Sequence, residues 1–159
     1  MRAEWAELDR RIGVFDDEFA TSTRTDEAAR RLATVPGIRP ISATTLVSAV
    51  GGARAFRRAR DFVTWLGLVP KQATTDGKPK LPGINKRGSR YLRKNLIQGA
   101  RAVLPRLAAT QARLGKWLRD LLVRVHKNTV IVALAAKLAR IAWAVLARGG
   151  SYEAAMAAS

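Results

Sequence analysis

The most constraining feature of this sequence is an apolar stretch, TVIVALAAKLARIAWAVLAR, at residues 129–148. Lys137 and Arg140 interrupt it, so it falls short of the roughly 18 uncharged residues that are typical of a membrane-spanning helix. An apolar segment of this length must be covered by the rest of the chain. We therefore expect a largely buried helix over residues 130–147 and no membrane association.

Several other segments carry apolar residues three and four positions apart, which is the period of an amphipathic helix. The first begins at Trp5 and ends at Phe19, before the polar break TSTRTDE. Thr25, followed by two acids, is predicted to cap a second helix that ends at Pro36-Gly37. Further helices are predicted over residues 58–66, from residue 88 onward, and over residues 114–125.

These patterns predict a mainly α fold class, since strand signals are weak throughout. We expect a helical domain with a helix-hairpin-helix-like element, a basic loop and an N-terminal coiled-coil-like helix. The predicted organisation is the end of a coiled-coil or linker helix over residues 1–24, the helical domain over 25–153, and a tail over 154–159.

The charge of the chain points to a polyanionic partner. Its 29 Lys and Arg residues outnumber 12 Asp and Glu residues, which gives a formal net charge of +17. Eight of the acids lie in the first 27 residues, so the remainder is far more basic still. A surface with this charge repels itself unless a polyanion neutralises it, and nucleic acid is the expected partner.

The residue composition argues against a metal site within this chain. Cysteine is absent and His126 is the single histidine, so neither a thiolate site nor a histidine cluster is available. The basic part of the chain holds only four acids, spread widely along the sequence. We therefore expect no metal ligands and no cofactor in this chain.

A helix-hairpin-helix-like element is suggested by LATVPGIRPISATTLVSAVGG. In such an element a tight turn between two helices offers backbone N–H groups to a DNA phosphate. Gly37, Ile38 and Arg39 are the candidate contacts. An ordinary corner between two packed helices is the alternative interpretation.

The stretch KQATTDGKPKLPGINKRGSRYLRK, residues 71–94, has eight basic residues and one acid. It contains aliphatic hydroxyl groups at Ser89, Thr74 and Thr75. Ser89 precedes a predicted helix and is best interpreted as its N-cap. Thr74 and Thr75 lie among glycines and prolines, where an exposed hydroxyl surrounded by cations could attack a phosphodiester. The predicted phosphate contacts in this stretch are Lys71, Lys78, Lys80, Lys86, Arg87, Arg90 and Arg93.

Taken in order, the VPGIRP turn, AFRRARDFVTWLGLVPKQ and GINKRGSRYLRK resemble a known family. They are similar to the C-terminal transposase domain of the DEDD insertion-sequence transposases, the Piv-like enzymes that act as bridge-RNA-guided recombinases. The resemblance covers about residues 5–153. It implies a helical domain whose hydroxyl nucleophile forms a covalent link to DNA during strand exchange.

The resemblance also has implications for individual residues. The catalytic serine of the family falls on Thr74, and its neighbour falls on Thr75, which is the less favoured candidate. The family holds a divalent metal such as Mg²⁺ in an N-terminal RuvC-like domain, which we expect this chain to lack. Family members also use a structured guide RNA and assemble into oligomers.

From these observations we expect a DNA-binding C-terminal domain of an insertion-sequence transposase, incomplete and inactive by itself. Its expected partners are DNA, a structured guide RNA, and either further copies of itself or full-length transposase. The expected location is the bacterial cytoplasm, in association with the nucleoid. The alternative is a non-catalytic binding or regulatory module that pairs with full-length transposase.

Overall fold

The structure is a computed structural model that describes residues 2–51, 54–69, 73–75, 78–80 and 88–153. Helices dominate the described residues, which confirms the predicted fold class. The helices, in chain order, are α1 (Arg2–Thr25), α2 (Glu27–Leu32), α3 (Pro40–Val50), α4 (Ala59–Trp65), α5 (Arg90–Ala108), α6 (Arg113–Arg124) and α7 (Lys127–Arg148). Between α4 and α5, the strands β1 (Ala73–Thr75) and β2 (Lys78–Lys80) pair antiparallel.

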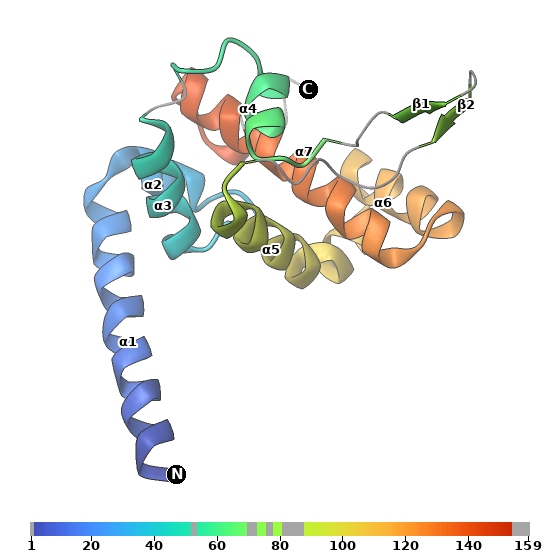
Figure 1. The fold of residues 1–159 in the computed structure, drawn as a ribbon. Coiled ribbons are helices and arrows are strands. Elements are labelled where there is room, and N and C mark those ends of the chain that lie inside the picture. The colour runs from blue at the N-terminus through green and yellow to red at the C-terminus, as the bar shows by residue number, and fades with distance from the viewer. Residues whose placement is uncertain (1, 52–53, 70–72, 76–77, 81–87, 154–159) are drawn as a thin grey trace.

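The apolar C-terminal helix α7 forms the centre of the helical body. Helices α4 and α5 pack along it, and α2 and α6 cover further parts of its surface (Figure 1). Among the helices that the structure describes, α7 is the one long and apolar enough to cross a membrane, with a mean hydropathy of 2.0, but most of it is buried inside the protein. This confirms the predicted buried helix. His126 caps its start, because its Nδ1 accepts a hydrogen bond from the backbone N–H of Asn128 at 3.2 Å.

Helix α1 extends past the apolar stripe that ends at Phe19, and its N-terminal part runs away from the body (Figure 1). It does not stop at the polar break but continues to Thr25. Its last turns pack against α3, where the buried hydroxyl of Thr23 lies 3.1 Å from that of Thr44. The apolar stripe of its outer part is exposed, with Trp5 65% and Phe15 55% accessible.

The predicted cap of the second helix was wrong by one residue. Asp26, and not Thr25, is the N-cap of α2, since its carboxylate accepts hydrogen bonds from Ala28 N at 2.9 Å and Ala29 N at 3.3 Å. The Thr25 hydroxyl instead donates to the Ser22 carbonyl of its own helix at 3.0 Å. The negative charge of Asp26 also suits the positive start of a helix better than a neutral hydroxyl does.

The turn between α2 and α3 lies directly on α5. Gly37 has a φ of 82°, and a Cβ placed on it would lie 2.9 Å from the carbonyl carbon of Gly99. A Cβ on Gly99 would collide with the carbonyl oxygen of Gly37. Glycine is therefore required at both positions, because the two backbones touch with no room for a side chain between them.

Candidate nucleic-acid interface

The segment that joins α4 to α5 starts and finishes beside Trp65 and Leu66, at the end of α4. Helix α4 ends at Trp65, and Leu66 is its C-cap. Gly88, at the far end of the segment, has a φ of 105°, and a Cβ on it would collide with the carbonyl oxygen of Trp65. The chain therefore leaves the helical body and re-enters it at one place. We call this place the loop base, formed by Trp65, Leu66, Gly88 and Arg93.

Arg93 completes the loop base from the inside. Its side chain is only 7% exposed, and its Nη1 donates a hydrogen bond to the Leu66 carbonyl at 3.2 Å. The predicted phosphate contact at Arg93 needs correction, because the guanidinium faces the interior, where it binds a carbonyl at the end of α4. The positive charge is well placed there, since a helix C-terminus carries a partial negative charge. None of the ion pairs formed within the described residues involves Arg93.

Strands β1 and β2, which follow α4 and precede α5 in the chain, form a short hairpin that projects from the helical body on the side where α6 lies (Figure 1). Thr74 pairs with Pro79, and Thr75 pairs with Lys78. Successive positions of a strand alternate between its two faces. Thr74 and Thr75 therefore occupy positions on different faces, and position 75 shares its face with positions 78 and 80.

The remaining predicted phosphate contacts of this stretch fall into two groups. Lys71, Lys86 and Arg87 lie outside the described residues. Arg90 is exposed at the first position of α5. The hydroxyl of Ser89 caps that helix by accepting a hydrogen bond from Leu92 N at 3.3 Å, which confirms the predicted cap.

The three residues predicted to contact phosphate at the helix-hairpin-helix-like turn differ in their burial and contacts. Ile38 is 4% exposed and belongs to the core, while its backbone N–H donates to the Val35 carbonyl at 3.0 Å. Gly37 is in contact with α5, as described above. The predicted phosphate contact at Ile38 needs correction, because its backbone N–H already donates to a carbonyl within the turn. Arg39 is exposed and remains available.

The sequence prediction did not include a group of arginines between α3 and α4. Arg54, Arg57, Arg58 and Arg60 are all exposed. Their signal was present as the run RAFRRAR at residues 54–60, but the resemblance drew attention to the later loop instead. This group adds a second concentration of positive charge next to α4.

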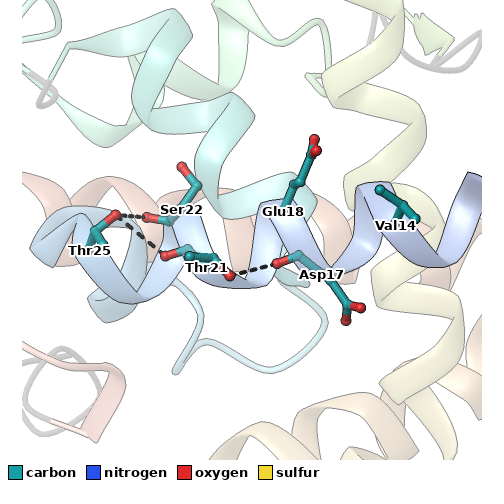
Figure 2. A pocket seen from close by; sticks show the side chains of 6 residues that line it. All are labelled: Val14, Asp17, Glu18, Thr21, Ser22 and Thr25. Atoms are coloured by element: carbon teal, nitrogen blue, oxygen red, sulfur yellow. Dashed lines mark hydrogen bonds between the residues drawn. The ribbon is translucent and has the colours of Figure 1, made fainter.

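A surface hollow on α1 has a different character from the basic regions. Figure 2 shows its lining side chains, which all come from this one helix. The Thr21 hydroxyl donates to the Asp17 carbonyl at 2.9 Å, and the Thr25 hydroxyl to the Ser22 carbonyl, so both hydroxyls are used by the helix itself. The described residues contain no group of three or more His, Asp or Glu side chains that could hold a metal ion. The hollow is lined by Val14, Asp17, Glu18, Thr21, Ser22 and Thr25.

A helical body with exposed arginines and a protruding hairpin defines a basic, mainly helical class of protein. Comparison with known families makes this more specific. Residues 29–116 match the family described as "Transposase IS116/IS110/IS902 family". This match covers more than half of the chain and includes the α2–α3 turn, the arginines beside α4 and the loop base. The chain belongs to the IS116/IS110/IS902 transposase family.

Curated relatives agree with this family. A Pseudomonas aeruginosa protein named "Probable family 20 transposase" is 44% identical over 152 residues, which are 96% of this chain and 45% of that protein. The transposase for insertion sequence element IS1328 of Yersinia enterocolitica is 43% identical, over 89% of this chain and 42% of its own length. The transposase for IS1111A of Coxiella burnetii is 36% identical, over 91% and 40%. This chain thus spans less than half the length of these relatives.

Proposed function

We propose that this chain supplies the DNA-binding and strand-exchange part of an insertion-sequence transposase. The observation that carries this proposal is the loop base. Gly88 against the Trp65 carbonyl and Arg93 on the Leu66 carbonyl fasten both ends of the hairpin segment to the end of α4. A basic hairpin presented from a fixed base is suited to holding a phosphodiester in one position, and positioning is a large part of catalysis in phosphoryl transfer.

The proposed DNA contacts surround this base. Arg90 lies in the first turn of α5, which has no acidic residue to offset its charge. A cation at a helix N-terminus is unfavourable for the free helix, whereas an anion there is stabilised. With Lys71, Lys78, Lys80, Lys86 and Arg87 in the same segment, and Arg39 at the α2–α3 turn, the charge favours contact with a DNA backbone.

The proposed chemistry uses the hydroxyl of Thr74. Its oxygen attacks the scissile phosphorus as its proton passes to a base, forming a phosphothreonine ester. The bond from phosphorus to a deoxyribose oxygen breaks, and that oxygen takes up a proton. Attack by a hydroxyl end of another strand reverses these steps and releases the threonine, so the phosphodiester energy is conserved. Thr75, on the other face of the hairpin, is the less favoured nucleophile.

The remaining partners follow from the family resemblance. A divalent metal held by a RuvC-like domain would stabilise the charge that develops at phosphorus. A structured guide RNA would select the DNA sites, and further copies or full-length transposase would complete the active site. We propose the bacterial cytoplasm and nucleoid as the place of action.

DNA binding tests the proposed interface. The Lys78→Ala, Lys80→Ala, Arg90→Ala triple variant should bind duplex DNA more weakly and should lower the slope of log affinity against log salt by about 2 to 3. The control is Arg2→Ala, Arg11→Ala, Arg24→Ala, which removes the same charge from exposed positions of α1. Equal slopes for the two triple variants would contradict the proposed interface.

A second candidate function is a non-catalytic module that pairs with full-length transposase. The exposed apolar stripe of α1 favours it, since Trp5, Leu8, Ile12 and Phe15 are each more than half accessible. Burial of such a stripe would stabilise a complex between helices. Light scattering after size exclusion tests this candidate: a strict monomer that forms no complex with full-length transposase would exclude it.

A further inference from the structure

The arginine cluster consists of Arg54, Arg57, Arg58 and Arg60, four exposed arginines within seven residues. Within the described part of the chain, none of them takes part in an ion pair or donates a side-chain hydrogen bond. Asp61 is the acid next to them in the sequence and lies in the first turn of α4. Four like charges at this spacing repel one another, so the cluster destabilises the free protein until an anion neutralises it.

Phe56 holds the middle of the cluster in place. Its ring meets those of Phe62 and Trp65, with centroids 5.4 Å and 5.5 Å away. Its carbonyl accepts a hydrogen bond from Nε1 of Trp143 on α7 at 3.2 Å. Both the ring and the carbonyl group of Phe56 are therefore held by the core. The backbone that carries the arginines is fixed before an anion binds, which lowers the entropy cost of binding.

Arg140 extends this surface, and α4 sets its distance from the loop base. Arg140 is exposed on α7 three residues before Trp143, so it occupies the neighbouring turn of the helix that receives Phe56. Helix α4 links the cluster to the loop base, because Arg58 precedes its first residue, Arg60 lies in its first turn and Trp65 is its last residue. Seven residues of helix span about 10 Å. The cluster is therefore a surface distinct from the hairpin segment but close to it.

We propose that the arginine cluster, with Arg140 at its edge, is a second phosphate-binding surface for the sugar–phosphate backbone of a nucleic acid. This goes beyond the function proposed above, which places the contacts on residues 71–94 and at Arg39. Guanidinium groups bind phosphate oxygens through two parallel hydrogen bonds and stay charged at any physiological pH. Backbone contacts of this kind position a nucleic acid without reading its sequence.

The test is binding of the Arg57→Ala, Arg58→Ala, Arg60→Ala variant to two probes. One is a random-sequence DNA duplex and the other an RNA hairpin with the same number of phosphates. Each lost phosphate contact lowers the salt slope by about 0.9 for a duplex, so the expected drop is about 2 to 3. A drop with the DNA probe assigns the surface to DNA, and a drop with only the RNA probe assigns it to RNA. Unchanged slopes with both probes would overturn the proposal.

Two controls separate a phosphate contact from a structural role. The corresponding triple lysine variant keeps the charge and should restore the salt slope. If it fails to restore the slope although its thermal unfolding matches the wild type, the arginines do not act as phosphate-binding cations and the proposal is wrong. The α1 triple variant described above controls for net charge. Loss of slope in the hairpin variant but not in this one would leave the proposed function intact and remove only the second surface.

Discussion

The backbones of Gly37 and Gly99 touch, so the turn between α2 and α3 rests on the middle of α5 without a side chain between them. The contact has a functional consequence. The turn that the sequence pattern assigned to a DNA phosphate packs against α5 at Gly37, whereas Arg39 is exposed. The contact therefore serves first to hold α2 and α3 in place against α5, whose N-terminus forms part of the loop base.

Gly99→Ala should be strongly destabilising. Its new methyl group would collide with the Gly37 carbonyl oxygen, and backbone in a packed core has little room to move. We expect the free energy of unfolding, measured by chemical denaturation, to fall by about 2 to 4 kcal/mol. Gly13→Ala is the matched control, because Gly13 is also helical but a Cβ placed on it would have no atom within 4 Å. It should be neutral or stabilise by up to about 1 kcal/mol. Equal effects would argue against the contact.

Arg93 and Arg90 should respond in opposite ways to substitution by alanine. Arg93→Ala leaves the Leu66 carbonyl without its hydrogen bond and should lower the free energy of unfolding by about 1 to 3 kcal/mol. Arg90→Ala should change stability by less than about 0.5 kcal/mol, since the residue is exposed, and should lower the DNA salt slope by about 0.9. Denaturation and salt titration of both variants check this. A stable Arg93→Ala protein that has lost a phosphate contact would place Arg93 on the DNA after all.

Gly88→Ala should weaken DNA binding although it removes no charge. The positive φ of Gly88 disfavours alanine, and the added Cβ would push the Trp65 carbonyl out of the loop base. We expect at least a tenfold loss of affinity in a titration with duplex DNA. Gly149→Ala supplies the comparison, because Gly149 also has a positive φ, 71°, but nothing lies within 4 Å of its Cβ position. Unchanged affinity in a folded Gly88→Ala protein would mean that the loop base does not position the hairpin.

Ser89→Ala should affect stability and leave the proposed chemistry intact. Loss of the hydroxyl that caps α5 is expected to lower the free energy of unfolding by about 1 kcal/mol. A Ser89→Asp variant would keep an N-cap acceptor and should recover most of that loss. Thermal unfolding checks both variants. If Ser89→Ala removed a protein–DNA adduct while remaining folded, the nucleophile would be Ser89 and not a threonine of the hairpin.

The sequence predicted those features that depend on neighbouring residues. Ser89 was recognisable as a cap because a helical pattern follows it immediately, and the buried α7 followed from its composition. The interior position of Arg93 was not predictable, because a basic run looks the same in sequence whether its cations face solvent or bind the carbonyl of an earlier helix. The role of Gly37 depends on Gly99, which is far along the chain, so spacing alone suggested a phosphate instead.

Covalent trapping tests whether the hairpin carries the nucleophile. The protein would be incubated with element DNA, guide RNA and a full-length transposase whose own nucleophile has been removed. A protein–DNA adduct should form with the wild type, disappear in Thr74→Ala and persist in Thr75→Ala. Thr74→Ser should form it faster, since it lacks the methyl group that crowds the attack on phosphorus. An adduct that survives Thr74→Ala, or no wild-type adduct with a partner that is active when intact, would contradict the claim.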